Sequence, residues 1–235
     1  MNETAPDDSA STGERLTGPS RGGEGRDGGM REIALHVLDI CQNSIEAGAT
    51  RVSVTVDEDT ARDSLAVVVA DNGRGMPPEL AGKAVDPFVT TRTTRKVGLG
   101  LALLAATARQ SGGSLTVASA EGEGTTVTAV FGLRNIDRPP LGDMPVTLSC
   151  LLAANPDLEL VYRHRRDGRE FVFEAGSFRE ELDGGSFSNP AVFVALRDHL
   201  AAGIRRVGGS EGTASARSSE GPDPGDREGE HGQDA

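Results

Sequence analysis

The sequence lacks the features of a membrane, secreted or nucleic-acid-binding protein. Its 235 residues include only two cysteines, Cys41 and Cys150, which make neither a disulfide framework nor a metal quartet. The longest apolar runs, such as Leu65–Ala70, are far shorter than the roughly 20 residues that span a bilayer. The amino terminus has no apolar core that could act as a signal peptide, and no basic patch suits nucleic acid. We therefore expect a soluble, cytoplasmic protein with neither membrane nor nucleic acid as a partner.

Much of the formal net charge of −12 lies at the two ends of the chain. Residues 1–29 hold six acids and three arginines, and residues 208–235 hold seven acids and two arginines. Both ends are also rich in glycine, serine and proline and poor in large apolar residues, which predicts disordered acidic tails. Residues 30–207 then carry a net charge of only −4 and are numerous enough to bury a core. Met30 could be an internal start.

The middle of the chain divides into two blocks, residues 30–135 and 143–205, on either side of a linker that contains Pro139-Pro140. Apolar periodicity in the first block predicts a helix, two strands, a glycine-rich loop, a helix and a hairpin. These expected elements are Arg31–Ala47, Arg51–Val56, Leu65–Ala70, Leu99–Ser111, Leu115–Ala118 and Thr125–Phe131. The second block predicts a helix, a hairpin and a last helix, at Pro145–Ala154, Leu158–His164, Glu170–Phe173 and Ala191–Ile204.

The first helix has a narrow polar front. At 100° per residue, the polar side chains fall within an arc of about 80°. They are Glu32, His36, Asp39, Asn43 and Glu46, while Ile33, Val37, Ile40, Cys41, Ser44 and Ile45 cover the other side. An ordinary solvated face would give this pattern, but the front has no lysine or arginine to pair with its acids. These residues alone leave a solvated face and a functional front equally open.

Three glycine-rich segments follow, and each is weak evidence when it stands alone. Asp71-Asn72-Gly73-Arg74-Gly75-Met76 could be a plain turn or a carboxylate at a pocket floor beside a flat ring. Gly98-Leu99-Gly100 before a helix could cradle phosphate, although it lacks the spacing of a P-loop or a dinucleotide fold. Glu121–Thr126 on its own is an ordinary hairpin turn.

The order of these motifs resembles the GHKL superfamily, whose ATP-binding fold is shared by gyrase B subunits, heat-shock chaperones, histidine kinases and MutL mismatch-repair proteins. The resemblance covers about residues 31–133. The motifs that carry it are Asp39 with Asn43, Asp71-x-Gly73-x-Gly75, Asp86-Pro87-Phe88, Gly98-x-Gly100-Leu101 and Gly122-x-Gly124-Thr125. It implies an α/β two-layer sandwich, a mixed sheet with helices on one face, to which the second block adds a small α/β appendage.

The resemblance implies ATP and Mg²⁺ as cofactors. Asn43 would offer its amide oxygen to Mg²⁺, and Asp71 would accept the adenine amino proton, with Thr125 supporting the same edge. The segment Pro87–Val97 would be a mobile lid over the phosphates. The ATP-binding residues that it implies are Asn43, Asp71, Gly73, Gly75, Met76, Thr90, Thr91, Lys96, Gly98, Leu99, Gly100, Leu101 and Thr125.

Asp39 lies one helical turn before Asn43, where hydrolysing members of the superfamily have a general-base glutamate. A carboxylate there could deprotonate water or a protein hydroxyl. Aspartate is shorter by one methylene, so Asp39 could instead hold only a magnesium-bound water. His36 could assist Asp39, although a buried histidine with a satisfied partner and no catalytic role is the commoner arrangement.

Two departures from the superfamily shape the expected function. Only 29 residues precede the first block, which leaves no acceptor-histidine hairpin, and the second block matches no large second domain. We therefore expect a protein kinase or ATPase that acts on a separate protein, with Asp39 as its base. The alternative is a non-hydrolysing switch in which ATP closes the lid and creates a docking surface for a partner. A homodimer is left open.

Overall fold

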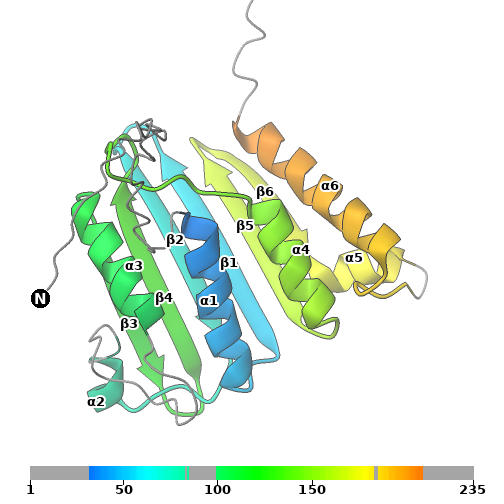
Figure 1. The fold of residues 1–235 in the computed structure, drawn as a ribbon, viewed down its shortest axis with the longest axis horizontal. Coiled ribbons are helices and arrows are strands. Elements are labelled where there is room, and N and C mark those ends of the chain that lie inside the picture. Colours follow the sequence, from blue (N-terminus) through cyan, green and yellow to red (C-terminus); the bar gives the residue numbers. More distant parts are fainter. Residues whose placement is uncertain (1–31, 83, 85–98, 183–184, 209–235) are drawn as a thin grey trace, which may run out of the picture.

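The computed structural model describes residues 32–82, 84, 99–182 and 185–208, and it arranges them in two layers (Figure 1). One layer is a six-stranded mixed sheet with the strand order β3-β4-β2-β1-β5-β6. The strands are β1 (Arg51–Asp59), β2 (Ser64–Asp71), β3 (Ser114–Ala120), β4 (Gly124–Gly132), β5 (Glu159–Arg166) and β6 (Arg169–Glu174). Neighbouring strands are antiparallel except β1 and β5, which run parallel. The expected acidic tails and Met30 lie outside the described residues.

The helices form the second layer. They are α1 (Ile33–Glu46), α2 (Pro78–Ala81), α3 (Leu99–Gln110), α4 (Met144–Ala154), α5 (Ala175–Glu181) and α6 (Pro190–Gly208). Helix α1 packs between α3 and α4, and α4 packs against α6, so these helices cover one face of the sheet (Figure 1). The predicted fold class, a mixed sheet with helices on one face, is confirmed. Among the described ranges, no helix is long and apolar enough to span a bilayer.

The core lies between the two layers because each contributes one apolar side. Alternate residues of a strand point to opposite faces, and Val52, Val54 and Val56 of β1 are all buried. On α1, Ile33, Val37 and Ile40 are buried at helical spacing. Helices α2 and α5 were not predicted, since elements of four and seven residues are too short to show an apolar period.

The C-terminal block is continuous with the sheet of the first block. Strand β5 lies beside β1 along its length, from the pair Arg51–Glu159 to the pair Glu58–Arg166. The linker before α4 runs over the start of α1, where the carbonyl oxygens of Pro140 and Leu141 accept hydrogen bonds from the first helical N–H groups. The linker thus caps the start of α1 and α4 packs along its side, so both support the helix that carries Asp39 and Asn43.

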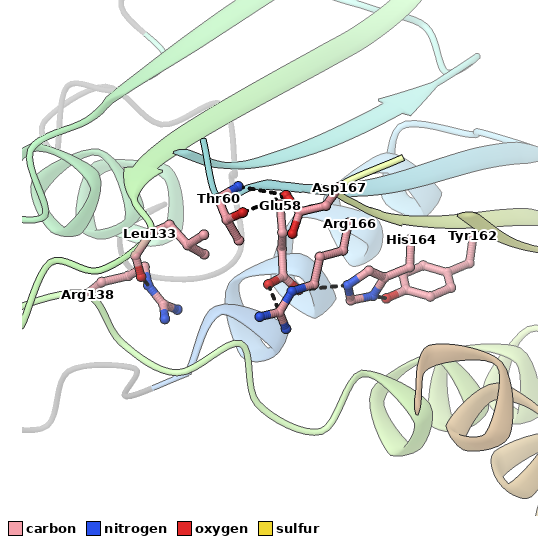
Figure 2. A network of polar contacts seen from close by, with 8 residues as sticks. All are labelled: Glu58, Thr60, Leu133, Arg138, Tyr162, His164, Arg166 and Asp167. Carbon is pink, nitrogen blue, oxygen red and sulfur yellow. Dashed lines mark hydrogen bonds and ion pairs between the residues drawn. The ribbon is translucent and has the colours of Figure 1, made fainter. Parts of the chain in front are cut away.

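A buried polar network joins β1 to β5 (Figure 2). His164 Nε2 lies 2.9 Å from Glu58 Oε1, and its Nδ1 lies 2.8 Å from the Tyr162 hydroxyl. Arg166 Nη1 is 3.7 Å from the other Glu58 oxygen. The hydrogen bond from His164 lowers the pKa of Glu58, helped by the charges of Arg166 and Arg138, whereas burial raises the pKa of the Tyr162 hydroxyl well above its ordinary value. Every member thus has a partner.

Candidate functional site

Asp71 is the centre of a hydrogen-bonded cluster at one edge of the sheet. It ends β2, and Thr125 is its cross-strand partner on β4. Its Oδ2 accepts a hydrogen bond from the Ser44 hydroxyl at 2.6 Å, and its Oδ1 accepts from the backbone N–H groups of Gly73 at 2.8 Å and Thr125 at 3.3 Å. The structure thus brings together three residues that the motifs singled out, Asp71, Gly73 and Thr125.

The Asp71 carboxylate has capacity for one further donor. An ionised carboxylate offers about four lone-pair sites, and the three hydrogen bonds above leave one of them on Oδ2. The side chain is half-buried rather than enclosed. This geometry fits the expected acceptance of an adenine amino proton, because that proton would complete the coordination of Oδ2.

Thr125 is held by a second cluster on the neighbouring strand. Ser119 Oγ donates to the Gly124 carbonyl at 2.9 Å, accepts from the Met76 backbone N–H at 2.8 Å, and lies 2.9 Å from Thr125 Oγ1. A hydroxyl has a single proton, so the bond between Ser119 and Thr125 takes its proton from Thr125. Thr125 Oγ1 then keeps lone pairs that can accept a further hydrogen bond.

The glycines of the site let backbone segments approach one another. Gly75 has φ +65°, and a Cβ there would overlap the Ala120 carbonyl. A Cβ on Gly73, which is buried, would lie 3.0 Å from Asp71 Oδ1. A Cβ on Gly124, which has φ +99°, would overlap the Asp71 carbonyl. These positions therefore keep the loop after β2 packed on the turn between β3 and β4.

Asp39 and Asn43 lie one turn apart on α1, and both are half-buried. The Asp39 carboxylate packs directly on Gly100 of α3, so closely that a Cβ on Gly100 would overlap Asp39 Oδ2. Gly100 and the half-buried Leu101 are in the first turn of α3, where backbone N–H groups have no partner within the helix. The structure therefore sets the predicted base against the predicted phosphate-binding turn.

Cys41, on the buried side of α1, is fully buried. Burial, with a smaller effect of the nearby Asp71 charge, raises the pKa of its thiol to about 12. The thiolate, which is the reactive form, is therefore suppressed at neutral pH. Cys41 therefore acts as inert packing on the side of α1 where the helical pattern placed it.

Several predicted site residues fall outside the described residues. These are Thr90, Thr91, Lys96 and Gly98, with the expected lid Pro87–Val97 and the motif Asp86-Pro87-Phe88. Leu99 begins α3, but its side chain is not among those described. Their roles stay predictions.

Sequence reasoning missed Ser44 and Ser119. Ser44 had been grouped with the apolar back of the helix, and its burial is confirmed, but its hydroxyl serves Asp71. Ser119 is the cross-strand partner of Thr125, which in turn is the partner of Asp71. The sheet register could therefore have revealed Ser119, since the side chains of directly paired residues lie on the same face of the sheet.

A family model described as "Histidine kinase-, DNA gyrase B-, and HSP90-like ATPase" matches residues 30–135. An NtrY-like sensor histidine kinase of Rickettsia conorii is 34% identical over 109 residues, which cover 46% of this chain and 18% of that protein. The sensor histidine kinase RegB of Cereibacter sphaeroides is 31% identical over 115 residues, covering 43% of this chain and 24% of RegB. The matched region is therefore less than a quarter of each relative.

Two solved structures are also similar. The mycobacterial sensor histidine kinase MprB is 26% identical with a TM-score of 0.35, covering 41% of this chain and 68% of that one. The N-terminal domain of a DNA repair protein is 14% identical with a TM-score of 0.45, covering 61% of this chain and 52% of that one.

The family match spans the elements from α1 to β4, and it therefore includes the Asp71 cluster and the contact between Asp39 and Gly100. With the sequence relatives, it identifies residues 30–135 as a histidine-kinase-like ATPase domain of the GHKL superfamily.

Proposed function

We propose that this chain binds Mg·ATP in the Asp71 site. It then either transfers the γ-phosphate to a separate cytoplasmic protein or hydrolyses the ATP. One observation carries the proposal: Asp71 is held by Ser44, Gly73 and Thr125 with a lone pair of Oδ2 left for an amino proton. The sensor histidine kinases among the relatives support a kinase.

The residues of α1 would do the chemistry. Asn43 and Asp39 offer oxygen atoms on the same face of the helix, which suits a hard cation and a general base. Bound Mg²⁺, held through Asn43, would neutralise phosphate charge. Asp39 would take the proton from water or from an acceptor side chain, and the first turn of α3 would turn its free N–H groups toward the phosphates.

The second candidate is an ATP-gated switch without turnover. It is favoured by the shortness of Asp39 and by its close contact with Gly100, which leaves the carboxylate packed on α3. In this version ATP would reposition the start of α3 and create a docking surface for a partner.

Asp39→Asn in the full chain separates the two candidates. If Asp39 is the base, ADP release falls about 100-fold or more while Mg·ATP binding survives. Asp198→Asn, at an exposed site on α6, is the matched control. Wild-type protein that binds Mg·ATP without releasing ADP, even when candidate acceptor proteins are added, would instead favour the switch. Equal turnover in Asp39→Asn would remove Asp39 as base.

A further inference from the structure

His36 is a buried side chain whose polar atoms are unsatisfied. Its residue is only 2% exposed, and neither Nδ1 nor Nε2 has a hydrogen-bond partner among the residues that the structure describes. A buried polar group without a partner costs about 1–3 kcal/mol. A leucine would fill the same space without that cost, so packing alone does not explain a histidine at this position.

The imidazole lines a cavity next to the Asp71 cluster. The cavity is lined by α1, α3, β2 and β4, and His36 is the only polar side chain among its described lining residues. Its other walls are Ile33, Val37, Ile40, Val67, Val69, Leu104, Val127 and Ala129. Val69 and Val127 are a cross-strand pair two residues from the pair Asp71–Thr125, and side chains two residues apart share a face of the sheet. The cavity therefore adjoins the proposed nucleotide site.

A resident water is a poor explanation for the histidine. The cavity measures about 10 Å³, at the lower limit for one molecule, and a buried water needs two to four polar partners. Apart from the imidazole, the lining side chains are hydrocarbon. Burial also lowers the pKa of His36, so the ring is neutral at physiological pH and has one N–H to donate and one nitrogen to accept.

Asp39 is an acceptor on the same face of α1 as His36. It lies three residues after His36, and helical side chains lean toward the N-terminus, which brings the Asp39 carboxylate over the turn that holds His36. Burial lowers the pKa of His36, and the negative charge of Asp39 opposes that effect. Gly100 bounds the carboxylate on the side of α3.

We infer that His36 is a positioning residue for Asp39. With nucleotide bound, its N–H donates to one Asp39 oxygen and aims the other at the water or hydroxyl that Asp39 deprotonates. The inference rests on the proposed function, and it explains why an unsatisfied histidine is kept beside an apolar cavity. It also predicts that the histidine costs stability in the free protein.

The test compares His36→Leu and His36→Gln in the full chain. Leucine removes the donor and should lower the turnover number for ADP release about tenfold, leave Mg·ATP affinity unchanged and raise the thermal midpoint. Glutamine keeps an N–H donor and should restore part of the turnover. In an Asp39→Asn background, His36→Leu should have no further effect on turnover. Val37→Ala, a cavity-lining change without polar atoms, should lower the midpoint and spare turnover.

The contrary results are distinct. Multiplicative losses in the double variant, or unchanged turnover in His36→Leu, would overturn the inference while leaving the proposed function intact. If wild-type protein binds Mg·ATP but does not release ADP, the ¹⁵N chemical shifts of the His36 ring test the inference. On addition of a non-hydrolysable ATP analogue, these shifts should change in wild type and stay the same in Asp39→Asn. Failure to bind Mg·ATP at all would overturn both proposals.

Discussion

The two ends of the central strands hold two carboxylates with opposite surroundings. At one end, Asp71 accepts hydrogen bonds from a hydroxyl and two backbone N–H groups, all of them neutral. At the other end, Glu58 is bonded to His164 and faces the guanidinium groups of Arg166 and Arg138. Among the residues that the structure describes, Asp71 is therefore held by neutral donors, whereas Glu58 is held by a histidine and faces two arginines.

This difference distinguishes Asp71, a candidate binding residue, from Glu58, a residue that stabilises the fold. A carboxylate with neutral partners and a spare lone pair can recognise a donor from outside. A carboxylate that is paired with cations and a buried histidine, as Glu58 is, instead stabilises the packing of β1 against β5. The comparison predicts that changes at the Glu58 end affect folding, and changes at the Asp71 end affect binding.

The largest effect on stability is expected for His164→Ala. This change leaves the buried Tyr162 hydroxyl without its partner and removes the histidine from Glu58, which keeps its ion pair with Arg166. Each buried polar group left unsatisfied costs about 1–3 kcal/mol. Urea unfolding of the full chain would measure the loss. Tyr162→Phe is the graded control, because it removes one hydroxyl and should cost only about 1 kcal/mol. Mg·ATP affinity of the folded fraction should not change, and a loss of affinity without a loss of stability would break the comparison.

Ser44→Ala should have the opposite effect, lowering Mg·ATP affinity with little change in stability. It removes the 2.6 Å hydrogen bond to Asp71, so the carboxylate loses its orientation and the dissociation constant for Mg·ATP should rise about tenfold, or 1.4 kcal/mol. Ser53→Ala is the matched control, since the Ser53 hydroxyl reaches only a carbonyl at 3.4 Å. Equal affinities of the two variants in a titration would show that Ser44 does not position Asp71.

A smaller effect is expected from acid at the Glu58 end. The pKa of Glu58 is lowered in the folded protein, so its contribution to stability is present above the unfolded-state pKa, near 4.3. That contribution is lost as the pH falls through the folded-state value. Unfolding free energies between pH 7 and pH 3 should therefore decline less steeply for Glu58→Gln than for wild type. Parallel declines would mean that Glu58 is not held as a charged partner.

Much of the first block could be predicted from the sequence, because its signals are local. The apolar period of α1 and the valine-rich β1 and β2 predicted their own elements, and motif order led to Asp71 with Thr125. What could not be predicted depends on contacts between distant segments. The pairing of β5 with β1 joins residues about 108 positions apart, and no local pattern specifies such a register.

The hydroxyl of Ser44 shows the same limit at the scale of one side chain. Helical periodicity correctly placed Ser44 on the buried side, but periodicity cannot say that the hydroxyl meets Asp71. His36 is the converse case, because the wheel put it on the polar front and the structure buries it between α1 and α3. In both cases the neighbouring element, rather than the helix itself, decides the environment.

Mg·ATP binding by the full chain, with and without Asp71→Asn, tests the central claim most directly. The account predicts saturable binding by wild type and a dissociation constant raised about 10- to 100-fold in Asp71→Asn, since hydrogen bonds to charged groups contribute about 1.5–3 kcal/mol. Asp198→Asn should bind as wild type does. Equal binding by wild type and a folded Asp71→Asn variant, or no binding by either, would contradict the assignment of this site.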